Sequence, residues 1–337
     1  MEIENKTLLH VLSKALGGTV THTVHQTKQL HGGTLGDVKL ISGMATASKG
    51  AEMPFNVVVK KQKSWKRHGD PGSWRREYDL YTSDFGEIFT SSLRWPLCYH
   101  AEMNEEENEF QLWLEYIEGV SGLELSGDMY EQAAYELGRF QGRLYAENPP
   151  VLQSLGNLSS TGYAKNFYLH YRSWQEVYDY IRSPNCEIPA HLCKMLMDTD
   201  ENSSSLWQRI EELPIVLCHR DFWVTNIFYS KGGIVLIDWD TAGWGYLGED
   251  IASLIADEAD VEHMVEYYHR CSEAYYKGFA EYVDVSGIKN NYIREMILFL
   301  FGYRLVEWYK FAQTPDGKAL HLNTLQKIYE LGRKNAK

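Results

Sequence analysis

The chain has 337 residues, which is enough for two lobes with large buried cores. Its formal net charge of −13 disfavours nucleic acid as a partner, because duplex binding needs a basic face, whereas an acidic surplus fits a cationic ligand better. No apolar run approaches the roughly 20 residues that a membrane span requires, so no membrane partner is expected.

The N-terminus and the cysteines indicate a protein of the cytoplasm. The first residues are acidic and polar and then amphipathic, without the basic start and apolar stretch of a signal peptide. Five cysteines are scattered along the chain without C-x-x-C pairs, so neither a disulfide framework nor a zinc site is indicated. A reducing, cytoplasmic location is therefore expected.

The first part of the chain is rich in strand patterns. A short amphipathic helix is expected within residues 1–18, and a second helix over Ser73–Ser83. The acidic stretch Glu105–Glu109 is expected to be an exposed hairpin tip. β-branched and alternating apolar residues predict five strands, with the second helix after the third strand. These strands are Thr19–Gln26, Val38–Ser42, Phe55–Lys60, Leu93–Ala101 and Phe110–Ile117.

The patterns become helical from Met129 onward. We place the boundary between the two parts after the fifth strand, which gives an N-terminal lobe of residues 1–118 and a C-terminal lobe of residues 119–337. The predicted helices are Met129–Ala146, Trp174–Arg182, Ala190–Met197, Ile251–Ala256, Val261–Val283 and Asn291–Phe311.

The strongest chemical signal lies in two apolar, strand-like runs between residues 215 and 237, each of which ends in polar residues. Asp221 and Asn226 follow the first run, and Asp238 follows the second. An aspartate that orients a hydroxyl and accepts its proton, with an asparagine and an aspartate that hold Mg²⁺, is the set of side chains that phosphoryl transfer needs. Lys231–Gly233 predicts the turn of a hairpin between the two polar segments.

The pattern H-x-D-x-x-x-x-N followed by I-D-W-D resembles the catalytic core of the aminoglycoside phosphotransferase and choline kinase superfamily, which is related to the protein kinases. The resemblance implies an α+β, bilobal, protein-kinase-like fold with a small antiparallel-sheet N-terminal lobe and a larger, mainly helical C-terminal lobe. It further implies that the first lobe binds the nucleotide and that the second carries the catalytic residues and binds the acceptor.

The resemblance also assigns nucleotide-binding residues in the N-terminal lobe. Lys60 at the end of the third strand would neutralise phosphate oxygens, with Glu77 on the following helix as its partner. Lys61 is a competing candidate, because strand alternation alone does not choose between the two lysines. Gly32 and Gly33 lie between the first two strands, where glycines let backbone amides approach phosphates. A plain glycine-rich hairpin is the alternative there.

The remaining nucleotide, catalytic and metal residues follow from the same resemblance. The backbone of Glu115 and Ile117 would pair with the adenine edge at the hinge between the lobes. Asp221 is expected to orient the acceptor hydroxyl and to take its proton late in transfer. Asn226 and Asp238 would ligate Mg²⁺, whose preference for hard oxygen ligands suits an amide and a carboxylate.

Four further residues are expected to support this centre. His219 would hydrogen-bond to the backbone and hold the loop rather than carry a proton. Arg220 is expected to form a structural salt bridge. Asp240 is a candidate for the metal site or its surroundings, and Asp250 would brace the catalytic loop or cap a helix.

The sequence thus predicts an ATP- and Mg²⁺-dependent phosphotransferase that moves the γ-phosphate to a hydroxyl of a small molecule. GTP remains open as a donor. An aminoglycoside-like antibiotic, a sugar and an amino alcohol remain open as acceptors, and the acidic and aromatic residues of the last helices, such as Glu307 and Trp308, suit a cationic one. The alternatives are a choline- or ethanolamine-type kinase and a catalytically silent kinase-like binding module.

Overall fold

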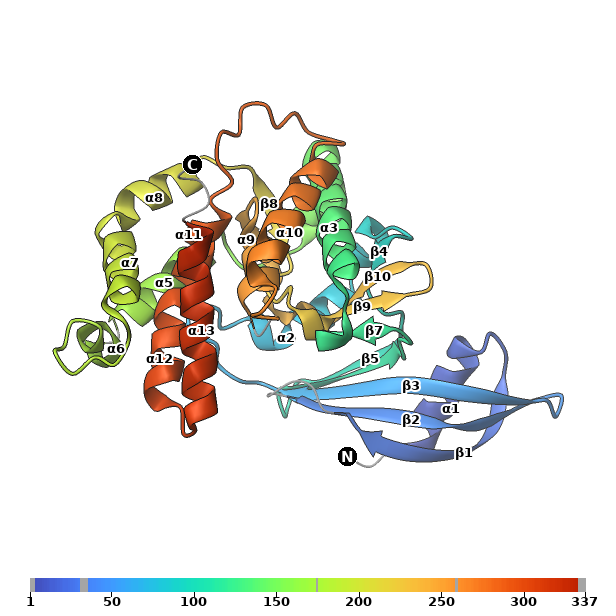
Figure 1. The fold of residues 1–337 in the computed structure, drawn as a ribbon. Coiled ribbons are helices and arrows are strands. Elements are labelled where there is room, and N and C mark those ends of the chain that lie inside the picture. Colours follow the sequence, from blue (N-terminus) through green and yellow to red (C-terminus); the bar gives the residue numbers. More distant parts are fainter. Residues whose placement is uncertain (1–3, 31–35, 174, 258–259, 333–337) are drawn as a thin grey trace.

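The computed structural model describes residues 4–30, 36–173, 175–257 and 260–332. A sheet-rich N-terminal part lies beside a larger part built mainly of helices. The long strands β1 (Val20–Gln29), β2 (Gly36–Ala47) and β3 (Glu52–Lys63) extend away from the larger part (Figure 1). This arrangement confirms the predicted α+β class, with the antiparallel sheet first and the helical region after it. The predicted phosphate-binding residues Gly32 and Gly33 lie outside the described residues.

The N-terminal sheet is antiparallel and has the order β1-β2-β3-β6-β5 among the described residues. Alternation along β3 turns Val57 and Val59 to the face covered by helix α1, where both are buried. Val58 and Lys60 therefore point to the opposite face. The elements of this part are α1 (Asn5–Ala15), β1 (Val20–Gln29), β2 (Gly36–Ala47), β3 (Glu52–Lys63), α2 (Ser73–Tyr81), β5 (Cys98–Asn104) and β6 (Glu109–Glu115).

The predicted strand Leu93–Ala101 is wrong in its extent. The chain instead forms β4 (Leu93–Arg94), which pairs in parallel with β10 (Gly233–Leu236), and only then enters β5. Pro96 lies between the two strands, and proline has no N–H to donate to a sheet. The short strand β4 therefore belongs with the strands of the C-terminal part.

The rest of the chain is mainly helical. The predicted boundary between residues 118 and 119 falls between β6 and β7, and it stays a prediction. The predicted helix Asn291–Phe311 is divided into α11 (Ile293–Ile297), a π-helical segment (Leu298–Gly302) and α12 (Tyr303–Phe311). The other elements are β7 (Val120–Ser121), α3 (Gly127–Glu147), α4 (Pro150–Ser154), α5 (Tyr163–Ser173), α6 (Gln175–Tyr180), α7 (Ala190–Glu201), α8 (Ser203–Ile210), β8 (Ile215–Cys218), β9 (Ile227–Ser230), β11 (Gly243–Tyr246), α9 (Glu249–Ala256), α10 (Met264–Phe279) and α13 (Pro315–Leu331).

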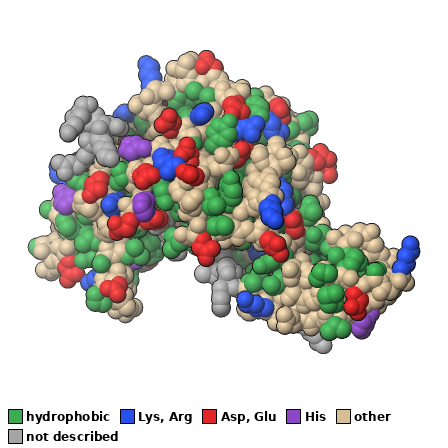
Figure 2. All heavy atoms as spheres, turned by 45° about the vertical axis from the view of Figure 1, so that its right-hand side comes forward, with side chains coloured by type: hydrophobic (Ala, Val, Ile, Leu, Met, Phe, Trp, Pro, Cys, Tyr) green, Lys and Arg blue, Asp and Glu red, His purple; other side chains and the backbone are tan. Residues whose placement is uncertain are grey.

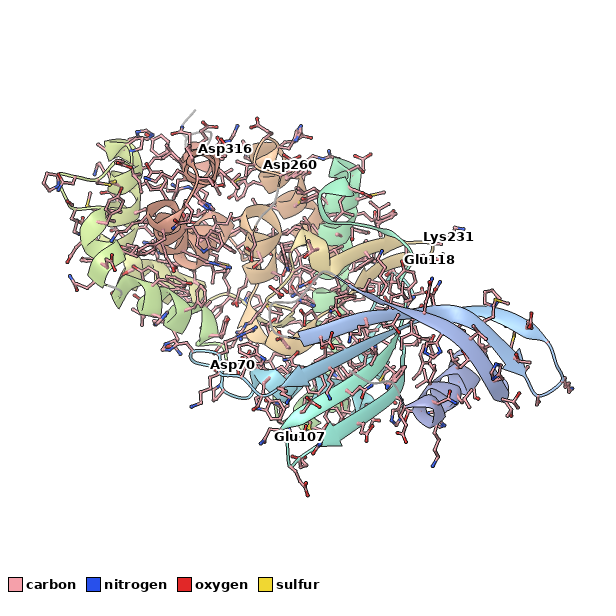
Figure 3. All side chains as sticks on the ribbon, turned by 90° about the horizontal axis from the view of Figure 1, so that it is seen from below. Asp70, Glu107, Glu118, Lys231, Asp260 and Asp316 are labelled. Atoms are coloured by element: carbon pink, nitrogen blue, oxygen red, sulfur yellow. The ribbon has the colours of Figure 1, made fainter. Side chains whose placement is uncertain are left out.

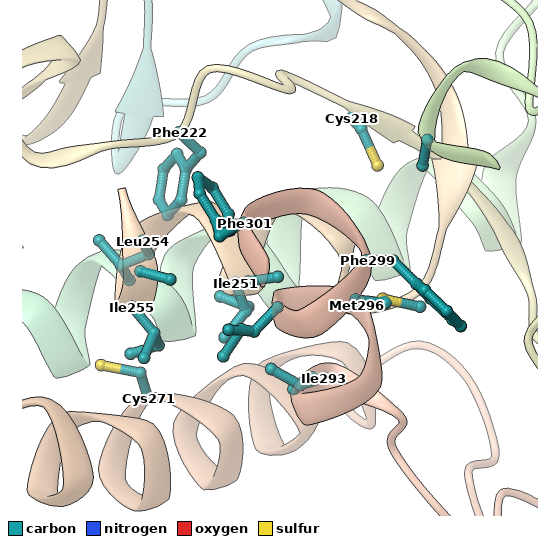
Figure 4. Packing of buried hydrophobic residues seen from close by; sticks show 14 of the residues in the cluster. Cys218, Phe222, Ile251, Leu254, Ile255, Cys271, Ile293, Met296, Phe299 and Phe301 are labelled. Atoms are coloured by element: carbon teal, nitrogen blue, oxygen red, sulfur yellow. The ribbon is translucent and has the colours of Figure 1, made fainter. Parts of the chain in front are cut away.

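The helices share a large apolar core with the strand that carries the catalytic motif. Phe222, just after β8, packs beside Phe301 of the π-helical segment (Figure 4). Ile251 of α9 and Ile293 of α11 belong to the same buried cluster. Because Phe222 is fully buried next to Asp221, the packing of the core fixes the backbone on which the predicted catalytic residue stands.

On one face of the molecule the acidic side chains are dispersed. On the face drawn in Figure 2, Asp and Glu side chains are scattered among Lys, Arg and apolar side chains rather than gathered in one patch. Within the described ranges, no helix combines the length and the apolar character that crossing a membrane would demand.

Glycines bring helices α3 and α10 into direct backbone contact. A Cβ built on Gly138 would overlap the carbonyl oxygen of Tyr275, and one on Gly278 would overlap that of Tyr135. Neither position has room for a side chain, so the two helices approach more closely than helices with larger residues can. This close approach fixes the position of Gln141, one turn beyond Gly138 on α3.

Replacing Gly138 by alanine is expected to lower the free energy of unfolding by about 1–3 kcal/mol, because α3 and α10 must move apart. Helix propensity alone would make alanine more stable than glycine by roughly 0.5–1 kcal/mol. A loss of stability therefore shows that the close contact between α3 and α10 outweighs propensity. Urea unfolding followed by circular dichroism measures it. The control is Gly156→Ala, since a Cβ there meets nothing within 4 Å. A more stable Gly138→Ala variant would contradict this account.

Candidate active site

The hairpin predicted between the two polar segments is present. Strands β9 and β10 pair in antiparallel register, with Ser230 opposite Gly233. Gly233 has a φ of +139°, and a Cβ there would meet the backbone of Ser92, so only glycine fits this position. Figure 3 labels Lys231 at the tip of this hairpin. The hairpin thereby brings the segment after β10, with Asp238, back towards Asn226 at the start of β9.

Lys60 lies at the centre of a buried ion cluster. Its Nζ is 2.5 Å from Oε2 of Glu77 on α2 and 2.7 Å from Oδ1 of Asp238 after β10. The contact with Glu77 is the pairing predicted from the sequence. Burial opposes the charged amine, but the carboxylates of Asp238 and Glu77 outweigh it and raise the pKa of Lys60. The cluster therefore joins the N-terminal sheet, α2 and the segment after β10.

Lys61 points away from this cluster. Its Nζ lies 2.5 Å from Oε1 of Glu109 at the start of β6. Glu109 is buried, so the prediction that it belongs to the exposed hairpin tip is wrong: the exposed turn spans residues 105–108, and Glu109 is drawn into the sheet by Lys61. Of the two candidate lysines, the structure brings Lys60 to the other predicted site residues.

The carboxylate of Asp250 holds the loop after β8 by accepting backbone N–H groups of that loop. Its Oδ2 accepts the N–H of His219 at 2.9 Å, and its Oδ1 accepts the N–H of Arg220 at 2.7 Å. The Nε2 of Gln141 donates to the same carboxylate at 3.0 Å and to the carbonyl oxygen of Leu217 at 2.9 Å. Of the two roles expected for Asp250, these contacts are those of a brace for the loop.

His219 is an uncharged link between two loops. Burial lowers the pKa of His219 to about 4, so the ring is neutral at neutral pH. Its Nε2 lies 3.0 Å from the carbonyl oxygen of Ile237, and the N–H of Asp221 donates to its Nδ1 at 3.3 Å. This pair of contacts requires the tautomer with the proton on Nε2. Both contacts are to backbone groups, as the sequence predicts.

Arg220 forms the expected structural salt bridge. Its guanidinium is buried, its Nε donates to Oε1 of Glu249 at 3.0 Å, and the group lies 4.7 Å above the ring of Tyr163. Further N–H groups donate to Oγ of Ser159 and to the carbonyl oxygen of Ser160. The backbone of Arg220 is left-handed, with a φ of 66°. The side chain thus fixes an unusual turn immediately before Asp221.

Asp221 and Asn226 contact each other across this loop. The Nδ2 of Asn226 donates to Oδ2 of Asp221 at 2.8 Å and to its backbone carbonyl oxygen at 3.0 Å. The amide nitrogen of Asn226 is engaged in this way, and its amide oxygen is left to accept. Burial, and then the charge of Asp238, raise the pKa of Asp221 to about 7.

The donor atoms fit a hard divalent cation. Lys60 contacts only Oδ1 of Asp238, so Oδ2 and the amide oxygen of Asn226 remain as the oxygen pair that could hold the ion. Burial, and then the charge of Asp238, raise the pKa of Asp240 to about 8. Among the described residues, no group of three or more His, Cys, Asp or Glu side chains is arranged to hold a metal alone. The pair therefore suits an ion that shares its coordination with phosphate oxygens.

The backbone groups predicted to pair with adenine at the hinge are partly used within the protein. Two N–H groups of Arg94 donate to the carboxylate of Glu115 at 2.7 and 2.9 Å, and the N–H of Glu115 donates to the carbonyl oxygen of Leu97 at 2.8 Å. This N–H is therefore engaged within the protein and not open to an adenine. Ile117 is buried beyond the end of β6. The nucleotide-binding roles of Glu115 and Ile117 stay predictions.

Arg76 is a residue of this site that the sequence motifs do not indicate. Its guanidinium forms a buried bidentate pair with Asp70 at 2.7 and 2.8 Å, and it donates to the backbone carbonyl oxygens of Asp240 at 2.6 Å and of Asn157. It thus ties α2 to the segment after β10. The sequence offers one signal for its role: Arg76 is a charged residue directly beside Glu77, on a helix whose Glu77 is expected to be buried.

Solved structures of kinases of small molecules share this fold. The GDP and kanamycin complex of APH(2")-IIia is similar, with 13% identity, a TM-score of 0.59, and coverage of 97% of this chain and 99% of that chain. Amicoumacin kinase hAmiN in complex with AMP-PNP, Ca²⁺ and Ami is 14% identical, with a TM-score of 0.54 and coverage of 97% of this chain and 94% of that chain. Choline kinase from Cryptosporidium parvum Iowa II is 14% identical, with a TM-score of 0.56 and coverage of 92% of this chain and 91% of that chain. These likenesses confirm the kinase-like fold.

Sequence comparison identifies the family. Residues 91–282, more than half of the chain, match the model of the phosphotransferase enzyme family. No curated protein matches the sequence. The chain therefore belongs to the phosphotransferase enzyme family, as its motifs predict.

Replacing Asp250 by alanine is expected to lower the free energy of unfolding by about 2–6 kcal/mol, because two buried backbone N–H groups lose their acceptor at about 1–3 kcal/mol each. Chemical denaturation measures the change. The control is Asp198→Ala: this exposed carboxylate pairs with Lys194 one turn away, and its loss is expected to change stability by less than about 1 kcal/mol. Equal effects of the two substitutions would refute the brace.

Proposed function

We propose that this protein is an ATP- or GTP- and Mg²⁺-dependent phosphotransferase that moves the γ-phosphate to a hydroxyl of a small molecule. The observation that supports this most directly is the 2.7 Å contact between Lys60 and Asp238, which are 178 positions apart in the sequence. The contact joins the lysine predicted to bind phosphates to the aspartate predicted to bind the metal. Positioning and charge neutralisation supply most of the catalysis in phosphoryl transfer.

In this mechanism each residue has one task. Lys60 neutralises phosphate oxygens of the donor, and Glu77 holds its amine in place. Asp221 orients the acceptor hydroxyl and takes its proton as the new oxygen–phosphorus bond forms and the bond to the leaving nucleoside diphosphate breaks. Asn226 and Asp238 would hold Mg²⁺, which when bound supplies positive charge beside the phosphate oxygens.

The acceptor that fits best carries a protonated amine. The Oε2 of Glu307 on α12 is buried and has no hydrogen-bond partner within the described part of the chain. Burial raises the pKa of Glu307, and the charge of Arg304 on the same helix opposes this rise. A protonated amine of the acceptor would supply the missing partner of the buried Glu307 oxygen.

Nucleotide binding is the first test. ATP and GTP are expected to raise the melting temperature in the presence of Mg²⁺ and much less without it. Lys60→Ala should weaken nucleotide binding by about tenfold or more, since a hydrogen bond to a charged group contributes about 1.5–3 kcal/mol. Lys61→Ala, one position along the same strand, is the matched control and should bind normally. No stabilisation of the unmodified protein by either nucleotide would favour the silent binding module.

Turnover is the second test. Asp221→Ala is expected to reduce transfer by about 10²–10⁴-fold while nucleotide affinity stays near that of the unmodified protein. Nucleoside diphosphate release is measured with panels of aminoglycosides, amino alcohols and neutral sugars. Activity only with quaternary amines would indicate a choline-type kinase, and activity only with neutral sugars would refute the amine-bearing acceptor. Undiminished turnover by Asp221→Ala would remove Asp221 from the mechanism.

A further inference from the structure

The connection between β3 and α2, residues 64–72, is held rigidly against the C-terminal part. Asp70 of this connection is buried in the bidentate pair with Arg76, and its N–H donates to the carbonyl oxygen of Arg67 at 3.1 Å in a tight turn. Figure 3 labels Asp70 beside the junction of the sheet and the helices. The backbone of Arg67 is therefore fixed in place next to the segment after β10.

The side chain of Arg67 faces the carboxylates of the active site. Its Nη2 lies 3.5 Å from Oδ2 of Asp240, and its guanidinium stacks 4.7 Å from the ring of Trp65. Burial and the charge of Asp238 raise the pKa of Asp221, and the charge of Arg67 opposes this rise. Through its contact with Asp240, Arg67 lies against the segment after β10, two positions from the proposed metal ligand Asp238.

Arg67 has hydrogen-bond donors that the protein does not use. Its Nη1 is buried, yet it has no hydrogen-bond partner in the part of the chain that the structure describes. The contact with Asp240 is a single, long one, in contrast to the two short hydrogen bonds of the Arg76 pair with Asp70. A buried donor without a partner is unfavourable unless a ligand completes it.

The other cation of the site is already engaged. Lys60 is held between two carboxylates at 2.5 and 2.7 Å, whereas Arg67 presents a planar fork of N–H groups with unused donors. Such a fork matches the oxygens of a phosphoryl group, which a lysine amine contacts only as a point charge. The ligand that suits Arg67 is therefore a phosphoryl group bound beside Asp240, next to the proposed metal ligand Asp238.

We propose that Arg67 is a further catalytic residue, which donates hydrogen bonds to the non-bridging oxygens of the phosphoryl group during its transfer. This inference rests on the proposed function. Arg67 forms and breaks no covalent bond: the phosphoryl group leaves the nucleoside diphosphate oxygen and joins the acceptor oxygen while the guanidinium remains protonated. Because negative charge is spread over the non-bridging oxygens in the transition state, these hydrogen bonds favour the transition state over bound substrate.

The test compares Arg67→Ala and Arg67→Lys with Lys66→Ala. Lys66 is the exposed neighbour on the same connection, so its substitution removes the same charge without touching the site. Arg67→Ala is expected to reduce nucleoside diphosphate release from ATP, to the acceptor or to water, by about 10²–10³-fold. The rate for Arg67→Lys should lie between those of Arg67→Ala and the unmodified protein, since lysine keeps the charge and lacks the planar fork of N–H groups. Lys66→Ala should match the unmodified protein.

A second measurement separates catalysis from folding and from ground-state binding. ADP with Mg²⁺ and aluminium fluoride mimics the phosphoryl group in transfer, and thermal stabilisation reports its binding. Arg67→Ala should lose the additional stabilisation by aluminium fluoride, while its melting temperature without ligand matches that of Lys66→Ala and its affinity for ADP stays within about twofold of that variant. This readout needs no acceptor.

The outcomes are distinguishable. Equal behaviour of Arg67→Ala and Lys66→Ala in an active protein would overturn the role of Arg67 and leave the proposed function intact. An equal loss of ADP and of the aluminium fluoride complex would show that Arg67 only positions the nucleotide or offsets Asp240, which also overturns it. An unmodified protein that neither binds nucleotide nor releases ADP would overturn the proposed function and this inference together.

Discussion

A buried lysine amine is the constraint on which the site depends. Removing an ammonium from water costs several kcal/mol unless anionic partners surround it. Lys60 has two such partners, Glu77 from α2 and Asp238 from the segment after β10, and these belong to different parts of the fold. The sheet, the helix and the hairpin can therefore satisfy the amine only in one mutual arrangement. That arrangement is the one that collects the carboxylates and the amide of the site.

Helix packing some distance from these groups determines where the loop after β8 lies. The glycine contact between α3 and α10 sets the position of Gln141, which donates to Asp250 and to the end of β8. Asp250 in turn accepts the backbone N–H groups of His219 and Arg220. A change in the packing of two helices is thus passed, through three hydrogen-bonded groups, to the residue that precedes Asp221.

The parts of the structure that the sequence predicted are those with a local pattern. The hairpin follows from its glycine turn. The pairing of Lys60 with Glu77 follows from the resemblance to the family, because the strand pattern alone does not choose between Lys60 and Lys61. The prediction of one strand over residues 93–101 is wrong because the apolar residues continue through Pro96, which has no N–H to donate and lies between two separate strands. The roles of Arg67 and Arg76 do not follow from the sequence for another reason: both contact Asp240, and no spacing in the sequence encodes a contact between segments more than 160 positions apart.

The anchoring of Arg76 has a consequence for the assembly of the site. An outward swing of α2 would strip its buried guanidinium of Asp70 or of the backbone of Asp240, at about 1.5–3 kcal/mol for each charged hydrogen bond lost. A form with several such bonds broken would be populated at well under about 1% of molecules. The contacts of Arg76 therefore hold α2 in the position that brings Glu77 to Lys60, so the ion cluster is already assembled before any ligand arrives.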